Sequence, residues 1–119
     1  MNSNDSTNST APKSRRIYLA GPMTGLPEFN FPAFAKAAAE LRAQGHFVFS
    51  PSENDFTRYG DDFLDHPERF NLRETVVDDL LWISRMAQAI ALLPGWENSK
   101  GVRAEKAVAE WLGLAVMYL

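Results

Sequence analysis

The sequence predicts an α/β domain in which helices cover both faces of a parallel sheet, and two observations support this. Short apolar runs of strand length alternate along the chain with helical patterns of about ten to fifteen residues. The chain has 119 residues, 45% of them hydrophobic, which is enough for one domain with a buried core. Strands joined by such helices need right-handed crossovers, so we expect a doubly wound sheet of roughly four to five strands in the order 2-1-3-4.

The first half of the domain is predicted to contain a strand, a helix and a second strand. Residues 16–20 form a mainly apolar run that has a β-branched residue, Ile17, near its start and is stopped by Gly21. Apolar residues at helical spacing predict a helix over residues 32–44, and Gly45 suits the position beyond its end. Residues 47–49 are short and apolar and predict the second strand.

The second half begins with a long segment, residues 52–71, that has no hydrophobic period and many acidic side chains. An irregular stretch of this length in a small domain is typical of a functional loop or lid, so we expect a loop here. Periodic apolar residues then predict helices over 73–86 and 99–112, and strand-length apolar runs predict strands at 89–93 and 114–119.

Composition excludes several classes of function. The formal net charge of −3 provides no basic field for a nucleic-acid polymer, although one pocket can still bind a free nucleotide. The apolar runs are too short to cross a membrane. The chain has no cysteine and only two histidines, so we expect no disulfide and no metal site, and the acidic segment 55–65 does not match a calcium-binding loop.

The first 14 residues differ in composition from the rest. They are rich in Ser, Asn and Thr and lack the apolar centre of a signal peptide. We therefore expect a disordered tail at residues 1–14, one domain at residues 15–119 and a cytoplasmic protein.

Candidate site residues follow the first and third predicted strands. Tyr18 lies near the end of the first strand, ahead of Gly21, and Gly95 and Trp96 follow the third. Ligands of doubly wound sheets bind beyond the carboxyl ends of the strands, where the strand order reverses. We therefore expect these residues and the start of the helix at 99–112 to surround one pocket.

Glu105 lies in the first half of that helix. A helical wheel places it on the flank of a stripe that would face the sheet, formed by Ala104, Val108, Trp111 and Leu112. Burial would raise the pKa of this carboxyl, whereas the helix N-terminus and hydroxyl donors would lower it. A weakly solvated carboxylate is a competent nucleophile toward an anomeric carbon. The alternative is a surface glutamate that pairs with a neighbouring charge.

Three neighbours of Glu105, namely Ser99, Tyr18 and Trp96, each have two interpretations. Ser99 can cap the helix, or it can bind an anion together with free backbone N–H groups, and Gly101 would let a sugar or phosphate approach closely. Tyr18 can orient the Glu105 carboxylate or only pack on a helix. Trp96 can stack on a base or form a subunit contact.

Asp78 and Asp79 are adjacent on the predicted helix 73–86. Adjacent helical positions point about 100° apart. One of the two carboxylates can therefore face the pocket while the other is solvated.

At these residues the chain resembles the nucleoside 2-deoxyribosyltransferase family, most closely its short phage and bacterial relatives. The resemblance covers residues 17–119 and rests on residues 17–25 (IYLAGPMTG), Asp79-Leu80, and residues 93–99 (LPGWENS) with Gly101 and Glu105. It implies a flavodoxin-like, or Rossmann-like, fold. The substrate-binding residues that it implies are Gly21, Pro22, Met23, Gly25, Gly95, Trp96, Ser99 and Gly101.

The resemblance also implies three catalytic roles. Glu105 would attack the sugar C1′ and release the base, Tyr18 would position Glu105, and Asp79 would contact the deoxyribose or protonate the base. The transferases carry an aspartate that contacts the base at the position of Ser99. Related 2-deoxynucleoside 5-phosphate N-hydrolases have a serine there that helps to bind phosphate, so Ser99 favours a nucleotide substrate.

We therefore expect cleavage of an N-glycosidic bond in two steps, through a deoxyribosyl-Glu105 intermediate that passes to water or to another base. No cofactor is needed. The expected partners are a small nucleoside or nucleotide and further copies of the chain, with the pocket shared between subunits. The alternative is a nucleotide-binding module without catalysis, or a phage accessory protein.

Overall fold

The structure is a computed structural model that describes residues 14–119. The tail expected at residues 1–14 lies outside the described residues except for its last position. Among the described residues, no helix combines the length and the apolar character needed to cross a membrane.

The centre of the fold is a parallel sheet of four strands in the order β2-β1-β3-β4, as predicted. The strands are β1 (Arg16–Ala20), β2 (Phe47–Phe49), β3 (Ala89–Leu92) and β4 (Ala115–Tyr118). In the sheet Tyr18 lies between Phe49 of β2 and Ile90 of β3. This central position leaves Tyr18 fully buried, with its ring stacked on that of Phe49.

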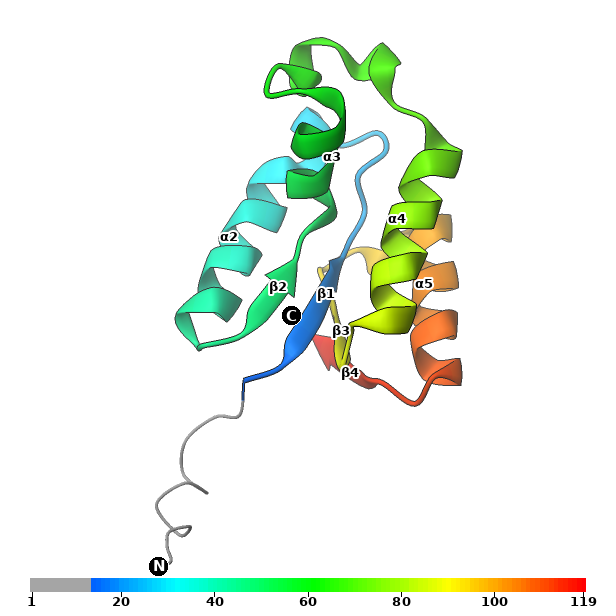
Figure 1. The fold of residues 1–119 in the computed structure, drawn as a ribbon. Helices are drawn as coiled ribbons and strands as arrows, with labels where there is room; N and C mark the ends of the chain where they lie inside the picture. Colours follow the sequence, from blue (N-terminus) through cyan, green and yellow to red (C-terminus); the bar gives the residue numbers. More distant parts are fainter. Residues whose placement is uncertain (1–13) are drawn as a thin grey trace, which may run out of the picture.

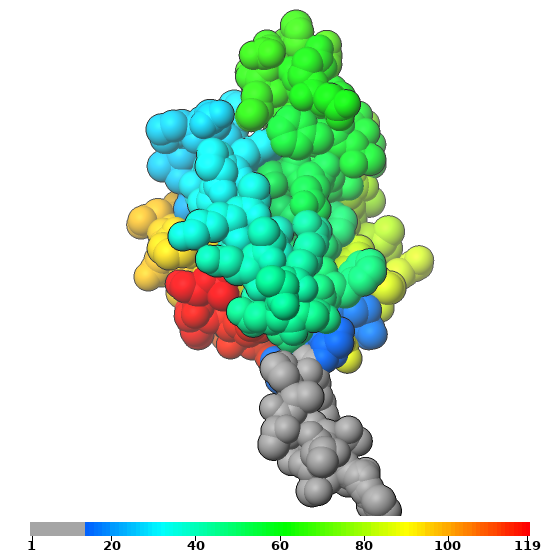
Figure 2. All heavy atoms as spheres, turned by 90° about the vertical axis from the view of Figure 1, so that its left-hand side faces the viewer, coloured from blue at the N-terminus to red at the C-terminus, as the bar shows by residue number. Residues whose placement is uncertain are grey.

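Helices cover both faces of the sheet (Figure 1). Helix α2 (Phe31–Ala43) lies on one face, whereas α4 (Leu72–Arg85) and α5 (Lys100–Trp111) lie on the other. Alternate residues of each strand therefore enter two separate cores: Ile17 and Leu19 pack toward α2, and Tyr18 and Ala20 toward α4 and α5. The space-filling view shows α2, in cyan, beside the C-terminal residues, in red (Figure 2).

The prediction of a loop at residues 52–71 is wrong in its first half. Helix α3 (Pro51–Tyr59) occupies that half, and two short 3-10 helices follow, η2 (Phe63–Asp65) and η3 (Pro67–Arg69). The inward positions of α3 do have a helical period, but polar or small residues and one tyrosine occupy them: Pro51, Ser52, Asp55 and Tyr59. A search for apolar periodicity cannot detect such a helix.

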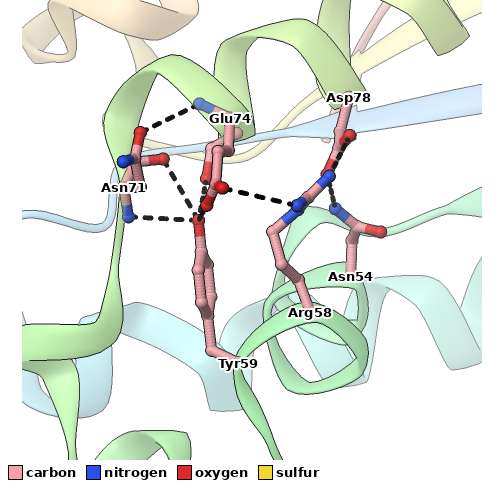
Figure 3. Close-up of polar contacts among 7 residues, drawn as sticks. Asn54, Arg58, Tyr59, Asn71, Glu74 and Asp78 are labelled. Carbon is pink, nitrogen blue, oxygen red and sulfur yellow. Dashed lines mark hydrogen bonds and ion pairs between the residues drawn. The ribbon is translucent and has the colours of Figure 1, made fainter.

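Helix α3 is attached to α4 by a group of polar contacts, which we call the α3–α4 polar contacts (Figure 3). Arg58 donates two hydrogen bonds to the Asp78 carboxylate, at 2.7 and 2.8 Å, and Asn54 donates a third at 3.0 Å. The Tyr59 hydroxyl lies 3.1 Å from the carbonyl oxygen of Asn71, the residue before α4. These contacts fix the orientation of α3 and hold Asp78 on the outer side of α4.

The buried face of the last helix also differs from the prediction. In α5 the buried residues are Val102 and Ala109, whereas Ala104 is exposed and 87% of Trp111 is accessible to solvent. The residues of α5 that face the sheet are therefore shifted by about one position from the predicted stripe, and Glu105 lies on this inner face. In α4 the buried residues are Asp79 and Ile83.

A left-handed turn precedes α2. Glu28, Phe29 and Asn30 have φ angles of 53°, 52° and 61°, which cost roughly 1–2 kcal/mol for each residue other than glycine. The Asn30 side chain donates a hydrogen bond of 3.0 Å to the Pro22 carbonyl oxygen and so holds the turn against the β1–α2 connection.

We expect Glu28→Gly to stabilise the protein, because Glu28 is exposed and glycine adopts this φ without a steric cost. The gain should be at most about 1 kcal/mol, since glycine also increases the entropy of the unfolded chain. Urea unfolding would measure it, with Glu40→Gly inside α2 as the control that must destabilise. A loss of stability in Glu28→Gly would contradict the interpretation of the turn as strained.

Candidate active site

The site lies beyond the carboxyl ends of β1 and β3, the two central strands where the strand order reverses. After β1 the chain passes so close to Leu93 that a Cβ on Gly21 would lie 2.7 Å from Leu93 Cδ1. After β3 the chain turns at Gly95, whose φ is +87°, and continues through η4 (Trp96–Asn98) into α5. Both glycines are thus required by the backbone geometry of the site.

Tyr18 and Glu105 are joined at the centre of the site. The Tyr18 hydroxyl donates a hydrogen bond of 2.7 Å to Glu105 Oε2. Glu105 is partly buried, and it forms none of the surface ion pairs found among residues 14–119, so the surface alternative is not realised. Burial, and secondarily the charge of Asp79, raise the pKa of Glu105 to about 8, while the Tyr18 hydrogen bond opposes this shift.

Asp79 supplies a second carboxyl from α4. It is only 6% exposed, and its Oδ1 atom has no hydrogen-bond partner among the described residues. Burial is the main cause that raises the pKa of Asp79 to about 7. Asp78 points away and binds Arg58, which holds the pKa of Asp78 below its usual range. The two adjacent aspartates therefore face opposite environments, as predicted.

The two buried carboxyls interact, because the charge of Asp79 contributes to the raised pKa of Glu105. Such a pair titrates as a unit and holds one proton at a pH between the two values. Burial, together with the charges of Glu105 and Asp79, also raises the pKa of Tyr18 well above its usual value, so the phenol keeps its proton and remains a donor.

One cavity of about 230 Å³ is lined by Tyr18, Asp79 and Glu105, and we call it the inner cavity. An outer cavity of about 580 Å³ adjoins it and shares Met23, Thr24, Ser99 and Gly101 with it. Of the predicted site residues, the inner cavity is lined by Tyr18, Gly21, Met23, Asp79, Ser99, Gly101 and Glu105, and the outer one also by Pro22 and Gly95.

Two predicted site residues line neither cavity. Trp96 packs on Tyr118 of β4, with ring centroids 6.0 Å apart, and the Lys106 ammonium lies 5.3 Å from the centre of its indole ring. Gly25 has a φ of +82° and forms part of a turn, and a Cβ there would meet nothing within 4 Å.

Ser99 is the N-cap of α5, since its hydroxyl accepts a hydrogen bond of 3.3 Å from the Val102 N–H. The same serine borders both cavities. Among the described residues, no group of three His, Asp or Glu side chains is arranged to hold a metal ion.

The sequence prediction missed Thr24 and Thr75, which line the inner cavity. It also missed Asp55, a buried residue of α3. The signal that could have identified Asp55 is its spacing of four residues from both Pro51 and Tyr59, which places all three on one face of a helix.

Comparisons with known proteins support the fold class and the family resemblance. A search of curated proteins finds no match. Among solved structures, the chain is similar to a 2-deoxyribosyltransferase from the psychrotolerant bacterium Bacillus psychrosaccharolyticus, described as a biocatalyst for the synthesis of antiviral and antitumoral nucleosides. The TM-score is 0.62 and the identity 27%, over 87% of this chain and 70% of the other. The resemblance noted in the sequence is thereby confirmed.

One family model matches the chain, over residues 15–118, which is almost the whole described domain. The model is described as a domain of unknown function, DUF4406. The chain therefore belongs to the DUF4406 family.

Proposed function

We propose that this protein cleaves the N-glycosidic bond of a 2-deoxyribonucleoside or of its 5′-phosphate. The observation that carries the proposal is the hydrogen bond from Tyr18 to Glu105 inside a cavity that also contains Asp79. The similarity to a 2-deoxyribosyltransferase supports the same reaction class.

In the first step Glu105 Oε1 or Oε2 attacks C1′, and the bond between C1′ and the base nitrogen breaks. The base leaves with the electron pair of that bond and accepts a proton from Asp79, whose raised pKa keeps a proton available near neutral pH. In the second step water or a second base attacks C1′ of the deoxyribosyl ester and displaces Glu105. Asp79 then takes up the proton of the attacking group. The sugar thus keeps its configuration, as in retaining glycosidases.

Ser99 and the start of α5 would bind the 5′ end of the substrate. Ser99 and Gly101 border the inner cavity, and the neighbouring Lys100 lines the outer one. A phosphate there would face a cation and the N-terminal end of the helix dipole. This arrangement supports a nucleotide over a nucleoside.

We further propose that the protein is cytoplasmic and that a second copy of the chain completes the site. Leu72 and Val76 of α4 line the inner cavity but are largely exposed, at 65% and 41%. A partner that covered these side chains would exclude water from the reaction.

The test is incubation of the purified protein with each 2-deoxyribonucleoside and its 5′-monophosphate, followed by chromatography of the released base. Addition of a second base in excess distinguishes transfer from hydrolysis. Binding of these compounds without release of base would instead favour the alternative, a nucleotide-binding module without catalysis.

The hydrogen bond from Tyr18 predicts a specific change in the pH profile. In the wild type we expect base release to be fastest between about pH 7 and pH 8, because the two carboxyls together hold one proton in this range, and the reactive form, with that proton on Asp79 and with Glu105 ionised, is then most populated. Tyr18→Phe removes a donor that lowers the pKa of both Glu105 and Asp79, so the acidic and the basic limb of the kcat/KM profile should both move to higher pH.

The rate of Tyr18→Phe at its pH optimum should also be about ten- to a hundredfold lower than that of the wild type. This factor corresponds to the free energy of one hydrogen bond to a charged group. Tyr59→Phe, which removes a hydroxyl among the α3–α4 polar contacts, is the control and should leave the pH limbs in place. An unchanged acidic limb in Tyr18→Phe would contradict the proposed role of Tyr18.

A further inference from the structure

A third cavity, of about 250 Å³, lies next to the inner cavity and shares Met23 and Thr24 with it. We call it the aromatic cavity, because its walls include Phe29, Phe31, Phe63 and Phe70. The Phe29 and Phe63 rings are nearly parallel, with an interplanar angle of 27°. The left-handed turn at residues 28–30 places Phe29 here, so backbone strain is found where this wall is formed.

Among residues 14–119, Asp55 is the only ionisable side chain that lines the aromatic cavity. It is 3% exposed, and no group in residues 14–119 forms a hydrogen bond with its Oδ1 atom. A buried polar atom without a partner is costly, and native proteins rarely leave one without a functional reason.

The surroundings of Asp55 favour its protonated, uncharged form. Burial and the nearby carboxylates of Asp79 and Asp78 raise the pKa of Asp55 to about 7. The nearest cation on α3, Arg58, is bound to Asp78 and does not pair with Asp55. A protonated carboxyl has one O–H donor and one carbonyl acceptor, which lie side by side.

We propose that the aromatic cavity binds the nucleobase of the substrate, and that Asp55, as a neutral acid, recognises a hydrogen-bond donor and an adjacent acceptor on the edge of the base. The phenylalanine rings offer flat apolar surfaces for the faces of a heterocycle. The amino group and ring nitrogen of adenine or cytosine, or the N3–H and O4 of thymine, match the pair on Asp55. This inference rests on the proposed function, because it places the base beside the sugar that Glu105 would attack.

The test compares each active substrate with an analogue that lacks the edge donor. Purine 2′-deoxyriboside replaces deoxyadenosine, and N3-methylthymidine replaces thymidine. In the wild type we expect kcat/KM to be about ten- to a hundredfold higher for the parent nucleoside, since unpaired polar groups penalise the analogue. In Asp55→Ala the ratio of kcat/KM for the parent nucleoside to kcat/KM for its analogue should fall. It should come close to the ratio expected from the chemical reactivity of the two compounds alone.

The variant Asp55→Asn tests whether Asp55 recognises the base as a neutral acid or as a carboxylate. Asparagine also has one donor side and one acceptor side, so the ratio should stay within about threefold of wild type. Loss of discrimination in Asp55→Asn, or an unchanged ratio in Asp55→Ala, would overturn the role of Asp55.

A second pair of variants does not depend on how well Asp55→Ala folds. Phe70 is 42% exposed at the edge of the aromatic cavity, whereas Phe47 is 63% exposed on the outer strand β2. Phe70→Ala should raise KM by about tenfold, because stacking on a base is lost, and Phe47→Ala should not. Equal effects of the two variants would place the base elsewhere.

Failure of the proposed function can be distinguished from failure of this inference. If the wild type releases no base, titration with free adenine and with purine still tests the cavity. Tighter binding of adenine that disappears in Asp55→Ala would support the base site while the proposed chemistry fails. Equal binding of the two heterocycles would overturn the base site.

Discussion

Glu105→Gln is expected to abolish base release and, at the same time, to make the protein more stable at pH 8. Glutamine can still accept the Tyr18 hydrogen bond, but it cannot form the sugar ester. Loss of a covalent nucleophile typically costs more than about a thousandfold in rate.

The gain in stability follows from the raised pKa of Glu105. The folded state keeps the Glu105 proton up to about pH 8, whereas in the unfolded chain this carboxyl titrates near its model value of 4.5. Between these values the folded state binds more protons, so the free energy of unfolding of the wild type falls as pH rises. Glutamine removes this loss, so the variant should gain up to about 4 kcal/mol at pH 8 and little at pH 4.

Glu97→Gln is the matched control, because Glu97 is an exposed carboxylate close to the start of α5. It should leave both the rate of base release and the dependence of stability on pH unchanged. Chromatography of released base and urea unfolding at pH 4 and pH 8 measure the two effects. A Glu105→Gln protein that still releases base would exclude Glu105 as the nucleophile.

Asp79→Asn is expected to slow base release by about 10²- to 10⁴-fold, the usual contribution of a general acid. Asparagine keeps the size of the side chain but cannot transfer a proton to the departing base. The variant also has no proton to lose at this position, so its rate should rise to a plateau as Glu105 ionises and should no longer fall at basic pH.

The leaving group provides an independent check of this role. A substrate whose leaving group needs no proton, such as p-nitrophenyl 2-deoxyriboside, should react with Asp79→Asn almost as fast as with the wild type. Asp78→Asn is the control: it weakens the ion pair with Arg58 but leaves the pocket carboxyl in place. Equal loss of rate on both kinds of substrate would show that Asp79 binds the sugar rather than transferring a proton.

The strand order and the position of Tyr18 near the start of α5 could be predicted from the sequence pattern, whereas the hydrogen bond to Glu105 is one of two interpretations of that pattern and is favoured only by the family resemblance. The strands are continuous apolar runs, and the rule for ligand sites in doubly wound sheets then places Tyr18 and the start of α5 at one edge. That reasoning depends only on which residues are apolar and where the strands end.

The aromatic cavity could not be predicted in this way. Helix α3 buries Asp55 and Ser52, so its inner face has no apolar period, and the region resembles a solvated loop in sequence. The inner face of α5 was misplaced for a similar reason, because it includes Glu105 and excludes Trp111. Polar residues that serve a site contradict the patterns from which buried faces are predicted.

The α3–α4 polar contacts have a mechanical consequence for the pocket. Tyr18 and Glu105 belong to elements that pack in the apolar core around the sheet, which salt does not weaken. Asp55 belongs to a helix attached to α4 by partly exposed charges, whose attraction is weakened by water and screened by ions. We therefore expect the side of the pocket at the sheet to be rigid, and the side formed by α3 to be more mobile and to become more so as the salt concentration rises.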